Sequence, residues 1–259
     1  MKANKIIICI LSAAVVLSSV AFANPYGEKS RPDSVGDIVF ADGTAMAWRE
    51  GLMLTDAQKK AAVAVIFYAG TECSNGGERR VLGVGLENAT DKNDKFAWTV
   101  LFSPSKLDGL GMTIESILCA PIDDERLAAT ATFTGDLDGS DNWQALYEVV
   151  DDEETSGKYP AWEWVNAYAK NNALSGEYAQ GWYLPTVAEL SMLYRAKDTV
   201  NAALEAAGGM KLRDSFYWSS SQYPDLSDYA WAVWLNNGFL SHFEQNRSKG
   251  SVCAVRAFN

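Results

Sequence analysis

The chain has 259 residues, with 22 lysines and arginines against 33 aspartates and glutamates and a formal net charge of -11. Such an acidic surface repels phosphate backbones and anionic head groups, which argues against a nucleic-acid partner. Hydrophobic residues make up 48% of the sequence and include nine tryptophans, so the chain can bury a substantial globular core.

The first 23 residues have the pattern of a cleavable export signal. Two early lysines precede an apolar run over 6–20, and Ala21-Phe22-Ala23 forms a small-x-small cleavage site. The run is shorter than the ~20 residues of a membrane-spanning helix, so we expect cleavage rather than retention as an anchor. The mature chain then starts near Asn24 with 20 basic and 33 acidic residues, a net charge of -13, no transmembrane segment, and a periplasmic or surface location.

Three cysteines remain after cleavage, namely Cys73, Cys119 and Cys253. This is an odd number for an oxidising compartment, so a Cys73–Cys119 bridge and three buried thiols both stay open. His242 is the only histidine, and no Cys/His spacing is typical of zinc. We therefore expect no metal and no cofactor.

The first half of the mature chain is predicted to be rich in strands. Residues 24–35 are polar and turn-rich and are expected to form a disordered leader. A β-rich N-terminal portion follows over 36–158, starting with a strand at 36–40 and a tight turn at Asp42-Gly43. Further strands are predicted at 62–68, 80–87 and 96–101.

Residues 120–159 are acidic and contain many turn residues. Asp136, Asp138 and Asp141 invite comparison with a calcium loop, because hard cations need several oxygens close together. An EF-hand loop starting at Asp136 would need Glu at its twelfth position, where this chain has Tyr147. A solvated acidic turn is the favoured interpretation, and it extends to the acidic run Asp151 to Glu154.

The pattern changes to helices after residue 159. A proline at a first helical position and an apolar stripe predict a helix over 160–170. Thr186 and Glu189 form a capping box that starts a second helix. A third helix is predicted over 199–207, with Gly208 as its left-handed stop.

The remaining residues return to a strand pattern. Apolar alternation over 229–235 leads to Asn236-Asn237-Gly238, a strong hairpin signal, and a return strand over 239–245. A last strand is predicted at 252–258. The C-terminal part should therefore form an antiparallel sheet.

Several ordered motifs in this part carry a resemblance to a known family. They are 181–186 (Gly-Trp-Tyr-Leu-Pro-Thr), 189–190 (Glu-Leu), 217–221 (Tyr-Trp-Ser-Ser-Ser), 230–233 (Ala-Trp-Ala-Val) and 252–256 (Val-Cys-Ala-Val-Arg). Together they resemble the Legionella-collagen-like C-terminal domain family, which is similar to the formylglycine-generating-enzyme branch of the C-type lectin fold. Two departures are Tyr183, where the family usually has Arg, and Val-Cys-Ala-Val-Arg in place of Val-Arg-Cys-Val-Arg.

The resemblance implies an α+β, C-type-lectin-like fold with two to three helices before a C-terminal antiparallel sheet. It covers a module at 159–259. Since such folds pair their first and last strands, a strand from 36–158 should complete the module and make 36–259 one continuous domain.

Formylglycine-generating relatives need a reactive cysteine pair and metal, whereas Cys253 lies in an apolar alternation and is expected to be buried and inert. With no GxSxG elbow and no phosphate loop, we expect no enzyme.

A binding role has a positive feature, because residues 219–249 alternate aromatics with polar side chains in a hairpin and loops. The expected ligand-binding residues are Tyr223, Tyr229, Asn236, Asn237, Phe239, His242, Asn246 and Arg247. The partner would be a protein or a glycan, although the triplets of calcium-dependent sugar binding are absent. The alternative is that Trp218, Trp231 and Trp234 are core and the polar residues are ordinary loop surface.

Two other functions fit the same sequence. One is an envelope structural or interaction protein without a small ligand. The other is a variable target of a diversity-generating retroelement, as for some proteins of this fold, in which mutated adenines turn Asn codons into codons for other residues. Residues 221–247 contain many of the residue types that such mutagenesis allows, with Trp231 and Trp234 as fixed framework.

Overall fold

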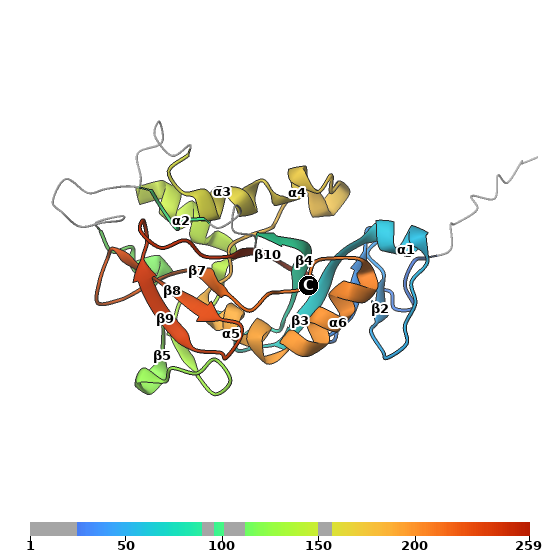
Figure 1. Cartoon of the computed structure of the whole chain (residues 1–259), viewed down its shortest axis with the longest axis horizontal. Helices are drawn as coiled ribbons and strands as arrows, with labels where there is room; N and C mark the ends of the chain where they lie inside the picture. Colours follow the sequence, from blue (N-terminus) through green and yellow to red (C-terminus); the bar gives the residue numbers. More distant parts are fainter. Residues whose placement is uncertain (1–24, 90–95, 101–111, 150–156) are drawn as a thin grey trace, which may run out of the picture.

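The computed structural model describes residues 25–89, 96–100, 112–149 and 157–259, which form an α+β fold (Figure 1). The strands are β1 (Asp37–Phe40), β2 (Ala45–Ala47), β3 (Ala62–Gly70), β4 (Arg80–Ala89), β5 (Cys119–Pro121), β6 (Phe133–Gly135), β7 (Phe216–Gln222), β8 (Tyr229–Trp234), β9 (Leu240–Glu244) and β10 (Val252–Ala257). The helices are α1 (Asp56–Ala61), α2 (Asn142–Val149), α3 (Pro160–Asn166), α4 (Tyr168–Asn171), α5 (Val187–Arg195) and α6 (Lys197–Ala207). No helix in these described ranges is both long and apolar enough to cross a membrane.

The central element is a five-stranded antiparallel sheet in the order β10-β4-β3-β1-β2. The last strand pairs with β4, with Val255 opposite Val84, so residues far apart in the sequence share one sheet. Helices α5 and α6 cover one face of this sheet, and α3 and α4 lie on the other side (Figure 1).

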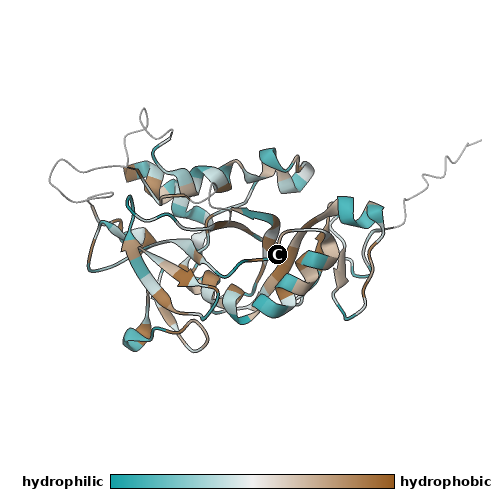
Figure 2. Cartoon of the chain, in the orientation of Figure 1, coloured by the Kyte–Doolittle hydropathy of each residue, from teal (hydrophilic) through white to brown (hydrophobic). Residues whose placement is uncertain are grey.

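Alternation along β3 divides the interior into two cores. Val65 and Phe67 pack with side chains of α5 and α6, whereas Ala64 and Ile66 pack with aromatic side chains of α3 and α4. Successive strand residues point to opposite faces, and β3 is buried on both, as its unbroken apolar sequence requires (Figure 2).

A second antiparallel sheet has the order β7-β8-β9, and the β5–β6 hairpin lies beside it. The predicted Asn-Asn-Gly turn joins β8 to β9, and Gly238 has a left-handed φ of 74°. The connection between β5 and β6 covers the turn end of β9, because Leu127 bridges Phe239 and the Leu240 N–H donates to the Arg126 carbonyl.

The predicted helix signals are confirmed, with small shifts. Thr186 caps α5, and both hydrogen bonds of the box with Glu189 are present. Gly208 ends α6 in the left-handed conformation, although this helix starts at Lys197. The helix expected over 160–170 is two short helices, α3 and α4, that meet at Ala167.

The leader expected to be disordered is instead attached to the sheet over its described residues 25–35. The Lys29 N–H donates to the Ala45 carbonyl, and the Lys29 carbonyl accepts from the Ala45 N–H, so this segment pairs with the edge of β2. The Tyr26 ring also lies 5.9 Å from that of Phe40. The polar composition concealed this pairing, because backbone hydrogen bonds need no apolar side chains.

The strand expected over 96–101 is wrong over its described part, 96–100. Phe96 makes only an isolated bridge to Gly250, and the Trp98 indole donates to the Ser219 carbonyl at 2.8 Å. This apolar stretch is buried through side-chain contacts with distant segments and not through a ladder. Leu101 lies outside the described residues.

The acidic turn is not fully solvated. Asp136 is buried and accepts from the Asn75 amide at 2.8 Å, and Asp138 pairs with Arg80 at 2.7 Å. Asp141 is exposed, and Asp151 to Glu154 lie outside the described residues. Partners from distant parts of the chain thus decided which carboxylates are buried.

Candidate recognition surface

The residues expected to bind a ligand lie in three places around the β8–β9 hairpin. Tyr229 is opposite Glu244 at the open end of the hairpin, and Val233 is opposite Leu240 near the turn, roughly 14 Å away along the strand. The open end holds Tyr223, Tyr229 and His242, the turn holds Asn236, Asn237 and Phe239, and the loop after β9 holds Asn246 and Arg247.

At the open end, Tyr223, Tyr229, Trp231 and His242 form what we call the aromatic cluster. The Tyr223 ring stacks on the imidazole of His242 at 4.0 Å and 20°. Trp231 meets Tyr223 edge-on at 5.0 Å, and Tyr229 lies 5.6 Å from His242. The structure therefore brings three of the expected residues together around a tryptophan that is only 2% exposed.

Arg126 completes this cluster and was missed by sequence reasoning. Its guanidinium lies 5.5 Å from the centre of the Trp231 ring, a cation–π distance. The side chain is half-buried, and no residue in the described part of the chain forms a hydrogen bond or ion pair with the guanidinium. No sequence pattern identifies Arg126 as part of the site, because the β5–β6 connection meets the β8–β9 hairpin only through tertiary contacts.

Two buried polar atoms of the cluster have no hydrogen-bond partner in the described structure, namely Nε1 of Trp231 and Nδ1 of His242. Buried polar groups nearly always have a hydrogen-bond partner, so an unpaired atom at a surface cluster is consistent with a ligand-binding role. Burial, together with the charge of Arg126, lowers the pKa of His242, while Asp225 opposes the shift. This shift favours the neutral imidazole, in which one ring nitrogen can accept a hydrogen bond.

A small cavity, which we call the notch, opens beside the cluster. Its volume is about 60 Å³, and it is lined by Ala120, Pro121, Asp124, Arg126, Tyr223, Pro224, Asp225 and Trp231. One wall is strained, because Asp123 and Asp124 have φ values of 57° and 53°. Each residue in this left-handed region costs about 1–3 kcal/mol, and such strain concentrates at binding sites.

The turn end of the hairpin presents an exposed apolar pair. Leu127 and Phe239 face each other across their bridge and are 45% and 44% exposed. Asn237 stabilises the turn by accepting from the Phe239 N–H at 3.0 Å. A cavity of about 440 Å³ adjoins it, lined by Ala129, Tyr194, Arg195, Lys197, Asp198 and Asn236.

Asn246 and Arg247 lie apart from both places. Neither residue lines the notch or the cavity at the turn, and Arg247 is held by Glu244, with 3.1 Å between the guanidinium and the carboxylate. The structure thus divides the expected surface and leaves these two residues on its margin.

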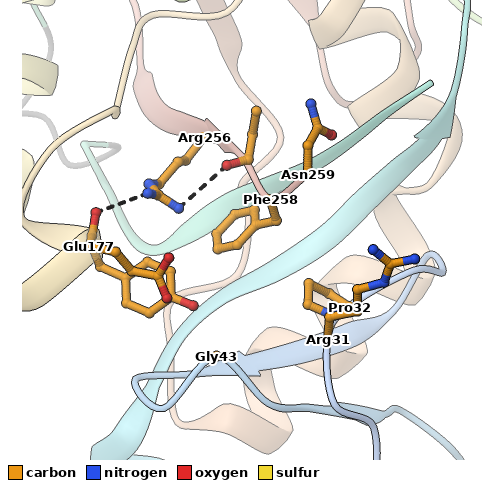
Figure 3. A pocket seen from close by; sticks show the side chains of 9 residues that line it. Arg31, Pro32, Gly43, Glu177, Arg256, Phe258 and Asn259 are labelled. Carbon is orange, nitrogen blue, oxygen red and sulfur yellow. Dashed lines mark hydrogen bonds between the residues drawn. The ribbon is translucent and has the colours of Figure 1, made fainter. Parts of the chain in front are cut away.

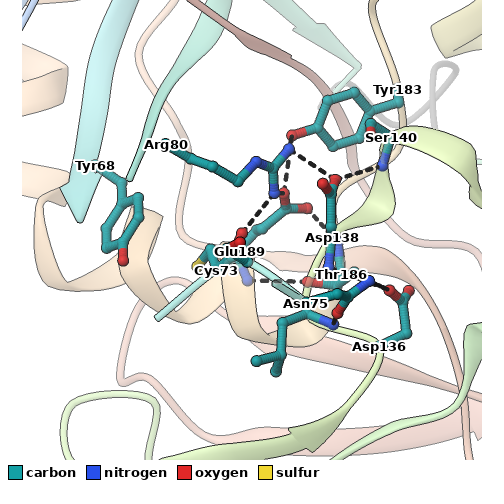
Figure 4. A network of polar contacts seen from close by, with 12 residues as sticks. Tyr68, Cys73, Asn75, Arg80, Asp136, Asp138, Ser140, Tyr183, Thr186 and Glu189 are labelled. Atoms are coloured by element: carbon teal, nitrogen blue, oxygen red, sulfur yellow. Dashed lines mark hydrogen bonds and ion pairs between the residues drawn. The ribbon is translucent and has the colours of Figure 1, made fainter. Parts of the chain in front are cut away.

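A buried polar network surrounds Arg80, the first residue of β4 (Figure 4). The guanidinium donates to the Cys73 carbonyl, pairs with Glu189 at 2.9 Å, and contacts the Tyr183 hydroxyl and Asp138. Burial raises the pKa of Glu189 to about 7, although Arg80 acts in the opposite direction. Because every charged member has a partner, the network is suited to joining elements and not to receiving a ligand.

A further cavity of about 260 Å³ lies around Arg256 (Figure 3). The guanidinium donates to the carbonyls of Gln180 and Glu177 and covers the Tyr178 ring at 4.9 Å. These contacts fix the end of β10 against residues 177–180. The donors of Arg256 are used within the chain, so this cavity is a weaker candidate than the notch.

The cysteines Cys73, Cys119 and Cys253 are all buried and unpaired. Burial raises the pKa of the Cys253 thiol to about 12, so it is not an activated thiolate. In the ranges that the structure describes, no group of three or more His, Cys, Asp or Glu side chains is arranged to hold a metal ion.

No protein-family model matches the chain, and no curated protein matches its sequence. Among solved structures, a fimbrial protein from Bacteroides ovatus ATCC 8483 is similar, with a TM-score of 0.57 and 14% identity. The match covers 87% of this chain and 49% of that protein, so this chain spans about half the length of its structural neighbour. At this identity the likeness shows the fold alone.

Proposed function

We propose that the chain is an exported, non-catalytic binding protein of C-type-lectin-like fold whose recognition surface is the aromatic cluster with its notch. The observation that carries the proposal is the half-buried Arg126 guanidinium over Trp231, whose buried indole N–H has no acceptor among the described residues. Such groups are costly in a closed core and useful in a site that a ligand completes.

Two contacts support the fold assignment. Tyr183, in the segment that precedes α5, forms a reciprocal bridge with Val255 of β10. The pairing of β10 with β4 supplies the early-to-late strand contact that the resemblance leads us to expect. On this basis the C-terminal module is completed by the N-terminal portion.

Export to the cell surface is the location that we propose. It is supported by the export signal pattern of the first 23 residues and by the fimbrial neighbour. A surface that is ordered before the ligand arrives loses little conformational entropy on binding. The aromatic side chains of the cluster already pack against one another, so they meet this condition.

The test is a glycan and protein array probed with the chain from residue 24 onward and with matched variants. A Tyr223→Ala/Tyr229→Ala variant removes two of the four rings of the aromatic cluster, and a Leu127→Ala/Phe239→Ala variant removes the exposed pair at the turn. Met53→Ala is the control, because this side chain is 90% exposed in the segment before α1. Circular dichroism and thermal unfolding verify that each variant is folded.

Binding that is lost in the cluster variant and kept in the turn variant and the control would support the proposal. Binding that is lost only in the turn variant would move the site to Leu127 and Phe239. If the cluster variant keeps full binding, the proposal is wrong.

An envelope structural or interaction protein without a small ligand is the second candidate. The exposed Leu127–Phe239 pair favours it, since adjacent apolar side chains on a surface suit contacts between proteins. Two results together would favour this function. The wild type would bind nothing on the array, and it would capture an assembled envelope component that the turn variant does not capture.

A variable target of a diversity-generating retroelement is the third candidate. Asn236 and Asn237 are exposed at the turn, where substitutions leave the strands intact. A neighbouring reverse-transcriptase gene with a near-copy of the coding region for 221–247 would support this function, and the absence of both would contradict it.

A further inference from the structure

We propose that the notch receives a single carboxylate side chain of a partner protein, with Arg126 and Trp231 as its hydrogen-bond donors. This inference rests on the proposed function of the same site and names the chemistry of its ligand.

Two of the side chains that line the notch, Arg126 and Trp231, carry hydrogen-bond donors. Trp231 is only 2% exposed, and its indole N–H has no hydrogen-bond partner in the described structure. The Arg126 guanidinium offers up to five N–H donors in a fixed plane, a geometry that matches a carboxylate. An acceptor that enters beside the Trp231 ring can therefore satisfy both side chains.

The local charge also favours an anion, although the protein as a whole is acidic. Asp124 and Asp225 line the notch but are exposed, so water and salt screen them, whereas Arg126 is half-buried. At His242 the influence of Arg126 exceeds that of Asp225. Arg126 is thus the least screened of the charges that line the notch, and the two exposed carboxylates would repel a second acidic group.

The volume limits the occupant to a small group. About 60 Å³ holds a few water molecules or a carboxylate. It is well below the ~300 Å³ at which pockets start to enclose whole small ligands. The end of an acidic side chain fits this volume, and a complete sugar ring does not.

The edge of β9 argues for a protein as the source of the carboxylate. The Trp234 N–H donates to the Phe239 carbonyl, and hydrogen-bonded pairs alternate along an antiparallel ladder. The main-chain groups of His242, which is opposite Trp231, therefore point away from β8. Within the residues that the structure describes, the backbone of 126–128 pairs only with 238–240, so this edge beside the notch can accept an extended peptide.

The test uses nuclear magnetic resonance, which can follow His242 without ambiguity because it is the only histidine. The chain from residue 24 onward is titrated at constant ionic strength with N-acetyl-glutamate N-methylamide and, as a neutral match, N-acetyl-glutamine N-methylamide. Methyl glucuronide forms a third arm that carries the carboxylate on a sugar. The signals observed are the Trp231 indole N–H and the imidazole of His242.

We expect the glutamate probe to shift the Trp231 indole signal saturably and to raise the pKa of His242, while the glutamine probe does neither. Arg126→Gln should weaken the response about tenfold, because a charge-assisted hydrogen bond is lost. Arg247→Gln, a change on the same hairpin but outside the notch, should leave it unaltered.

Equal responses to the two peptide probes, or an unchanged response in Arg126→Gln, would overturn the inference. Tighter binding of the glucuronide would also overturn it, by making a sugar the source of the carboxylate. The outcome is separable from that of the array. Array binding that needs Tyr223 and Tyr229 but not Arg126 would sustain the proposed function and defeat this inference alone.

Discussion

The guanidinium of Arg80 lies 2.9 Å from the carboxylate of Glu189, although 109 residues separate the two in the sequence. Arg80 begins β4, and Glu189 is the third residue of α5, where its other carboxylate oxygen accepts from the Thr186 N–H. One side chain therefore caps a helix and also binds that helix to the central sheet.

Arg80→Ala should destabilise the fold strongly, because it leaves the fully buried Glu189 without its cation. Removing one partner of a buried pair costs about 3–5 kcal/mol. Urea unfolding measures the loss, and Arg49→Ala is the control, since its pair with Glu28 is exposed and its removal should change little. Equal stability of the two variants would contradict a central role for Arg80.

Thr186→Ala should cost about 2 kcal/mol, and Thr55→Ala about 0.5 kcal/mol. Both threonines form complete capping boxes, but Thr186 is buried and Thr55 is exposed at the start of the short α1. Water can replace the lost acceptor only at Thr55. Thermal unfolding of the two variants under one buffer condition tests this order.

Gly238→Ala should be more destabilising than Gly51→Ala. Both glycines have left-handed φ values, 74° and 77°, which cost an alanine about 1 kcal/mol. At Gly238 an added Cβ would also lie 2.5 Å from the Tyr194 ring, whereas nothing lies within 4 Å at Gly51. Steric crowding adds about 1–3 kcal/mol. Similar unfolding midpoints would show that the Tyr194 ring moves aside freely.

His242 should titrate below its usual pKa of 6.5, because burial and Arg126 both disfavour the imidazolium. Below 6.5 the unfolded chain then binds a proton that the folded chain does not, so this residue's contribution to stability falls as the pH drops. Imidazole resonances measure the pKa directly. Arg126→Gln should raise it, and an unchanged value would remove Arg126 from the surroundings of His242.

The elements that the sequence predicted well are those with local signals. The capping box at Thr186, the stop at Gly208 and the hairpin turn ending in Gly238 each depend on residues a few positions apart. Their hydrogen bonds and backbone conformations follow from that spacing whatever the rest of the chain does.

The contacts that sequence reasoning missed are all long-range. Arg126 reaches Trp231 only because Leu127 bridges Phe239, and Arg80 meets Glu189 only because β4 passes α5. Neither arginine stands in a pattern that distinguishes it from a surface residue. Tyr223, Tyr229 and His242 were thus predictable from the aromatic hairpin, and their cationic neighbour was not.

The pairing of β10 with β4 has a consequence for the order of events during synthesis. A nascent chain that ends before Val252 leaves one side of β4 without a partner and keeps Cys253 and Val255 out of the core they complete. Because non-local contacts stabilise a fold only after the intervening chain has been ordered, the central sheet closes late. A chain with this topology therefore completes its central sheet only after its last strand has been synthesised.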